Sequence, residues 1–196
     1  MVRVFLTCIA ALVAAGTVSS VSAQQVTLLP CDGSRARIGL MAGLSGDSER
    51  AFDTGLDASA SLELGVKDRF GIRGEAGNVS STLGRTYASG EPTRHDDVRL
   101  RRVALMMMRT HTPWCEDRWR VYWGVGAGAY RYRFAGAQDA GIRRGGLRGL
   151  AGFELASLSR NVSWSGEVGL DAVRGPDDYP YTLFVASFRL GVKIKF

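Results

Sequence analysis

The chain has 196 residues, 45% of them hydrophobic, and a formal net charge of +6. This length suits one domain, and the basic residues are scattered along the chain, which argues against a nucleic-acid-binding protein. After the N-terminal region no stretch approaches 18 consecutive apolar residues, so we expect no transmembrane helix there.

The N-terminus has the three parts of a secretory signal peptide. Arg3 precedes the apolar run VFLTCIAALVAAG, and Val21-Ser22-Ala23 forms an A-x-A-like cleavage site. The apolar run is short for a membrane span, although a retained anchor is the alternative. We therefore expect removal of residues 1–23, a short N-terminal segment at 24–33 and a folded domain at 34–196, with the net charge falling to +5 because Arg3 is lost.

Two cysteines, Cys31 and Cys115, remain after that cleavage. An even pair in an exported chain predicts a disulfide, and two separate thiols are the alternative. Two thiols without C-x-x-C spacing or a nearby histidine pair cannot fill the four positions of a zinc site. We therefore expect neither a metal nor a cofactor.

Segments with alternating apolar and polar residues recur along the rest of the chain. Such a period of two predicts β-strands, because successive side chains of a strand point to opposite faces. Eight segments show it, at 34–45, 56–66, 70–79, 98–110, 118–132, 147–157, 162–173 and 181–196.

The connections between these segments alternate in length. The longer ones cover 45–55, 80–97, 133–146 and 174–181, and the tighter ones cover 67–69, 111–117 and 158–161. Long loops on one side and short turns on the other are typical of bacterial outer-membrane β-barrels. A soluble antiparallel sandwich would show the same alternation, so other features must decide between the two.

The polar face of the predicted strands carries many small residues and charges of both signs. This composition suits the filled interior of a narrow barrel, where opposite charges neutralise one another. Asp57 belongs to this face, and we expect a connected lumen charge network there, made by Arg37, Glu63, Arg73, Glu75, Arg120, Glu154, Glu167, Asp171 and Arg189.

Aromatic residues on the apolar face fall near strand ends, as in the interfacial girdles of membrane barrels. Phe184 would lie on the long-loop side; those expected on the short-turn side are Phe70, Trp119, Trp164 and Phe196.

The chain ends in GVKIKF, with alternating apolar residues and a terminal Phe196. This ending resembles the C-terminal recognition strand of Gram-negative outer-membrane proteins. Residues 34–196 resemble, in architecture, the small eight-stranded outer-membrane barrels of the OmpA-transmembrane/OmpX type. The resemblance implies an all-β, eight-stranded antiparallel up-and-down transmembrane barrel in the outer membrane of a Gram-negative-type bacterium. Residues 24–33 and both cysteines would then be periplasmic.

The same resemblance implies the partners. It points to a monomer that contacts outer-membrane lipid and lipopolysaccharide and that is assembled by the barrel-assembly machinery, with Phe196 as its signal. Arginine matches phosphate geometry, so lipopolysaccharide phosphates could be bound by arginines in or near the loops. The candidates are Arg85, Arg94, Arg143, Arg144 and Arg148.

The fourth segment has an ambiguous phase. Val98 and Leu100 suit the lipid face in one phase, whereas Val103, Leu105 and Met107 suit it in the other. A β-bulge near Arg101–Arg102 would supply one extra residue and reset the phase. We therefore expect a local irregularity there.

Three functions fit such a barrel. A lipid A-modifying hydrolase would need a His–Ser–acid arrangement, but His111 in RTHTPW and His95 in TRHDD lack the expected motif context. GVGAGAY at 124–130 lacks the full nucleotide-binding pattern, and inward glycines in a crowded lumen explain it better. A narrow pore is the second alternative. We favour a non-enzymatic barrel with a charge-filled lumen and surface loops for structural or interaction roles.

Overall fold

The computed structural model describes residues 36–47, 54–82, 97–113, 119–134, 143–157, 161–174 and 182–196. The expected signal peptide, the segment 24–33 and the cysteines Cys31 and Cys115 lie outside these residues. No helix in the described part of the chain is long and apolar enough to cross a membrane.

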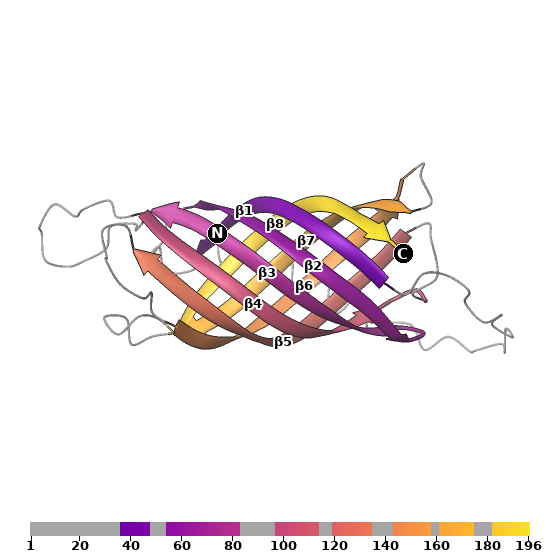
Figure 1. The fold of residues 1–196 in the computed structure, drawn as a ribbon, viewed down its shortest axis with the longest axis horizontal. Coiled ribbons are helices and arrows are strands. Elements are labelled where there is room, and N and C mark those ends of the chain that lie inside the picture. The colour runs from indigo at the N-terminus through magenta and orange to yellow at the C-terminus, as the bar shows by residue number, and fades with distance from the viewer. Residues whose placement is uncertain are drawn as a thin grey trace, which may run out of the picture. The chain divides into compact units, whose positions relative to one another are not determined.

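Eight antiparallel strands form a closed barrel in chain order, and β8 returns to pair with β1 (Figure 1). All eight predicted strands are present, most of them one to three residues longer than the alternation indicated. Their bounds are β1 Ala36–Asp47, β2 Gly55–Lys67, β3 Phe70–Thr82, β4 Asp97–Thr110, β5 Trp119–Phe134, β6 Arg143–Ala156, β7 Val162–Arg174 and β8 Thr182–Lys195.

The two faces of the sheet have inverted polarity compared with a soluble protein. Large apolar side chains such as Leu56 and Met107, each 69% exposed, cover the outside, while charged side chains are buried within. An outer surface of this kind belongs in hydrocarbon rather than in water, because contiguous exposed apolar patches on soluble monomers are far smaller. The lengths of the strands, 12 to 16 residues, are sufficient for a tilted membrane span.

Aromatic side chains lie on the outer surface near the short-turn end. Trp119 and Trp164 flank Leu155 in one row across β5, β6 and β7, and Phe70 and Phe196 are exposed at the same end. The backbone amide of Phe196 donates a hydrogen bond to the carbonyl of Ala36 (3.0 Å), which joins the end of β8 to the start of β1. This placement matches an interfacial girdle.

The irregularity expected in β4 does not exist, and that prediction was wrong. β4 pairs with β3 and β5 in unbroken register from Val98 to Arg109, and its even-numbered residues all face the lumen. Val98 and Leu100 are buried inside instead of facing lipid, so the strand needs no change of phase and Arg102 also points inward. A register shift does occur elsewhere, between Gly65 and Lys67 beside the Asp68–Arg69 turn.

Candidate functional site

The lumen contains most of the charged residues that the structure buries. Six carboxylates and eight cations are buried, with at most 7% of each residue exposed. The carboxylates are Asp57, Glu63, Glu75, Glu154, Glu167 and Asp171, and the cations are Arg37, Arg73, Arg102, Arg120, Arg148, Arg189, Lys193 and Lys195. Each side chain points inward because it occupies an inward parity position on its strand.

Glu75 is the centre of this network. Its carboxylate lies 2.6 Å from Arg189, 2.7 Å from Arg73, 2.9 Å from Arg148 and 3.1 Å from Arg102. These four arginines come from four different strands, so one carboxylate joins opposite walls of the barrel. A charge held in this way is compensated several times over, which a buried carboxylate requires.

Glu167 and Glu63 extend the network across the barrel. Glu167 contacts Arg73, lies 2.7 Å from Arg189 and accepts a 2.6 Å hydrogen bond from the Tyr122 hydroxyl. Lys193 bridges the two carboxylates, at 2.6 Å from Glu63 and 3.5 Å from Glu167. The network is therefore continuous, because each carboxylate shares its cations with the next.

The network reaches toward both ends of the lumen. Toward the long loops, Arg102 lies 2.9 Å from Asp57, and Asp171 accepts hydrogen bonds from Arg148 and from the Tyr130 hydroxyl, each 2.6 Å long. The short-turn end is held by Glu154, which contacts Arg120, Arg37 and the Ser163 hydroxyl.

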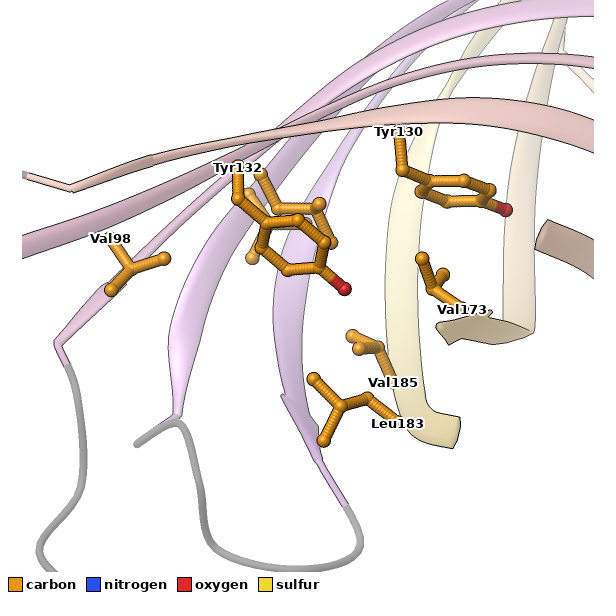
Figure 2. Packing of buried hydrophobic residues seen from close by; sticks show 8 residues of the cluster. Val98, Tyr130, Tyr132, Val173, Leu183 and Val185 are labelled. Atoms are coloured by element: carbon orange, nitrogen blue, oxygen red, sulfur yellow. The ribbon is translucent and has the colours of Figure 1, made fainter. Parts of the chain in front are cut away.

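An apolar cluster occupies the long-loop end of the lumen. Figure 2 shows the rings of Tyr130 and Tyr132 lying opposite Val173, Leu183 and Val185. We call this cluster the apolar plug; its buried residues are Val79, Val98, Leu100, Tyr130, Tyr132, Val173, Leu183 and Val185. Each is at most 6% exposed, so the plug packs this part of the lumen, next to the charge network that Tyr130 joins through Asp171.

Glycines let the strands pack around this filled interior. At Gly126 an added Cβ would lie 2.0 Å from the carbonyl oxygen of Leu105, on the neighbouring strand β4. At Gly124 it would lie 2.3 Å from the sulfur of Met108, which packs with Met106, Tyr122 and Leu150 in a second buried cluster. The GVGAGAY stretch is therefore a packing feature of β5.

All nine residues of the predicted lumen network lie inside the barrel, together with Asp57. Sequence reasoning missed Arg102 because of the supposed bulge, and it assigned Arg148 to lipopolysaccharide although Arg148 is 1% exposed and faces the lumen. It also omitted Lys193 and Lys195 from the network. The parity of GVKIKF, with its lysines opposite the apolar residues, was the signal that could have placed them.

The histidines form no hydrolytic arrangement in the described part of the chain. The His111 side chain is exposed, its ring centroid lies 6.5 Å from that of Trp119, and no described serine or carboxylate contacts it. His95 lies outside the described residues. A general base needs a nucleophile within hydrogen-bond reach, and His111 has none there.

Comparisons with known proteins agree with this architecture. No protein-family model and no curated protein sequence matches the chain. Among solved structures it is similar to OprG of Pseudomonas aeruginosa, with 14% identity, a TM-score of 0.59, and 84% of this chain and 97% of OprG covered. The chain has the fold of the small eight-stranded outer-membrane barrels. Sequence reasoning recognised that fold, and the comparison confirms it.

Two further structures support this assignment. Neisserial surface protein A matches with 13% identity and a TM-score of 0.58, over 82% of this chain and 96% of that protein. Ail of Yersinia pestis, solved with the heparin analogue sucrose octasulfate, matches with 14% identity and a TM-score of 0.53, over 83% of this chain and 97% of Ail. The predicted location in a Gram-negative outer membrane agrees with these neighbours.

Proposed function

We propose that this outer-membrane barrel is a non-enzymatic and non-conducting protein that acts through its long-loop end and its outer wall. Its lumen provides mechanical support instead of a passage or an active site. Structural or interaction roles at the cell surface follow from that design, because the loops of a barrel are what its surroundings can reach.

The filled lumen is the observation that carries this proposal. An eight-stranded barrel has an interior only wide enough for side chains. Here the charge network centred on Glu75 fills the middle and the apolar plug fills the long-loop end. Ions would have to displace a connected set of ion pairs and then cross an apolar constriction, and both steps oppose steady conduction.

Single-channel recording in planar bilayers tests the sealed lumen. The protein should show heat-modifiable migration, which reports a folded barrel, and no steady conductance. Replacing Leu100 and Leu183 of the plug by Ala should produce more frequent brief openings, whereas the matched outward pair Leu105→Ala and Leu190→Ala should not. Large, steady conductance steps from the unaltered protein would contradict the proposal.

Mass spectrometry of lipid A tests the absence of enzymatic activity. Lipid A incubated with the folded protein should keep its mass, and His111→Ala should behave like the unaltered chain. Loss of an acyl chain or a phosphate with the unaltered protein, abolished in a histidine variant, would establish the hydrolase alternative instead.

Assembly is the third part of the proposal. Phe196 is 64% exposed on the outer wall, at the end of a strand whose outward residues are apolar, which suits recognition by the barrel-assembly machinery. Deleting Phe196 should lower the amount of protein in isolated outer membranes, whereas deleting an outward aromatic from another strand, by Phe153→Ala, should lower it less.

A further inference from the structure

Five arginines form an outward-facing patch at the long-loop end of β4, β5 and β6. We call them the rim arginines: Arg99, Arg101, Arg131, Arg133 and Arg143. Register brings them together, because Arg101 pairs with Arg131 and Arg131 pairs with Arg143, while Arg99 pairs with Arg133 in the adjacent row. Neighbouring strands are about 4.8 Å apart, so Arg101, Arg131 and Arg143 span roughly 10 Å along the wall.

The rim arginines lack anionic partners within the described part of the chain. None of them makes an ion pair or a side-chain hydrogen bond there, and the Nε atom of Arg131 is enclosed without a hydrogen-bond partner. Like charges directly opposite each other destabilise a sheet. A patch with three such cross-strand arginine pairs is therefore suited to bind anions supplied from outside the chain.

An apolar groove lies directly on the membrane side of this patch. Its volume is about 820 Å³, and its walls come from β1 to β5, including Ala60, Gly74, Ala76, Ala127 and Ala129. Small side chains create it: nothing lies within 4 Å of a Cβ placed on Gly74. Ala129 is two residues before Arg131 on β5, so groove and arginines are about 7 Å apart along the strand.

We propose that this wall of the barrel is a docking site for lipopolysaccharide, whose lipid A phosphates bind the rim arginines while an acyl chain occupies the groove. The inference rests on the proposed function for its outer-membrane location. Charge complementarity selects the occupant: arginine forks match phosphate oxygens in pairs, and several arginines in a row suit a lipid with more than one phosphate. A free anion would use the arginines but would leave the groove empty.

The site differs from the arginines that sequence reasoning selected for this ligand. Arg148 is committed to Asp171 and Glu75 in the lumen. Arg144 is half-buried and donates to the carbonyl of Arg143. Arg85 and Arg94 lie outside the described residues. Of that earlier set, Arg143 alone belongs to the rim patch as the structure describes it.

Binding of bisphosphorylated lipid A to the protein, refolded from urea into nonionic detergent, tests the arginines. The triple variant Arg101→Gln/Arg131→Gln/Arg143→Gln should raise the Kd at least tenfold. Arg109→Gln is the matched control, since Arg109 is outward-facing on the same strand but near the short turns, 5.6 Å from the centre of the Phe70 ring, and it should leave the Kd within twofold. Equal effects of the two variants would overturn the site.

Two outward glycines test the groove. Gly74 lines it and Gly149 does not, and at both positions a Cβ would meet nothing within 4 Å. Gly74→Leu should therefore weaken lipid A binding about threefold or more without disturbing the fold, while Gly149→Leu should leave it unchanged. An unchanged Kd for Gly74→Leu would remove the acyl chain from the proposal.

Other ligands distinguish the source of the phosphate. Dephosphorylated lipid A, phosphatidylglycerol, inorganic phosphate and sucrose octasulfate should each bind at least tenfold more weakly than bisphosphorylated lipid A, and increasing salt should weaken binding of the latter. Equal binding of phosphatidylglycerol, or preferred binding of the sulfated sugar, would overturn the assignment to lipopolysaccharide.

A folded, non-conducting barrel that does not bind lipid A would overturn the docking site and leave the proposed function intact. A conducting barrel that binds lipid A would overturn the proposed function and leave the docking site intact.

Discussion

Arg101 and Arg102 are neighbours in β4, yet they belong to opposite surfaces with opposite electrostatics. Arg102 lies in the lumen between Asp57 and Glu75, whereas Arg101 lies on the outer wall opposite Arg131. The same side chain therefore stabilises the barrel in one place and is available to bind a ligand in the other. The surroundings of the arginine determine its role. A buried guanidinium must be compensated by carboxylates inside the protein, whereas an outward one can be neutralised by anions from outside the chain.

The largest expected effect comes from removing a lumen charge. Arg102→Gln should lower the free energy of unfolding by about 3–5 kcal/mol, since it leaves the buried carboxylate of Asp57 without its ion-pair partner. Arg101→Gln should change it by less than about 0.5 kcal/mol, as is usual for exposed substitutions. Urea titration in detergent, followed by heat-modifiable migration, measures both. Similar losses for the two variants would contradict the division into inner and outer surfaces.

Glycines provide a second contrast between the surfaces. Gly126→Ala would place a methyl group against the backbone of Leu105 and should cost about 1–3 kcal/mol, as overpacking does. Gly149→Ala, on the outer face with open space around its Cβ, should cost less than about 1 kcal/mol. The same unfolding titration compares them, and a larger loss for Gly149→Ala would show that the lumen wall is looser than its contacts indicate.

A double-mutant cycle tests whether the inner ion pairs act as pairs. Asp57→Asn and Arg102→Gln together should be less destabilising than the sum of the single changes, by about 1–2 kcal/mol. Asp57 lies 2.9 Å from Arg102, which makes direct coupling the expected source. Asp57→Asn and Arg101→Gln lie on opposite faces of the wall, so the loss of unfolding free energy in this double variant should equal the sum of the two single losses within about 0.5 kcal/mol. Additivity in the first cycle would mean that Arg102 depends mainly on its other carboxylates.

The smallest expected effect on stability comes from removing one of the rim arginines. Arg131→Gln removes a charge that lies opposite Arg101 and Arg143, so it should stabilise the lipid-free barrel by about 0.2–1 kcal/mol. The gain should be present at low salt and vanish near 1 M salt, where screening is strong. Destabilisation at low salt would indicate that Arg131 holds the wall together instead of serving a ligand.

The strands and their two faces follow from the sequence. Alternation is a local property of the chain, and the small and charged residues opposite the apolar ones already marked the inside of a narrow barrel. For that reason the sequence alone places Arg37, Arg73, Glu75 and Glu167 in the lumen. The long loops, the cysteines and the N-terminal segment lie outside what the structure describes, so the predictions about them stand as predictions.

Only the tertiary structure decided the phase of β4 and the partners of each charge. Val98 and Leu100 look like lipid-facing residues, but they belong to the same buried cluster as Tyr132 and Leu183, and hydrophobicity alone cannot distinguish an apolar lumen from a bilayer. Arg73 meets Glu167 and Arg189 meets Glu75 across 94 and 114 residues of chain. Closure and register bring such residues together, and they also assemble the rim arginines from three strands. A pattern read along the chain contains the direction of each side chain, but not which strand it will face.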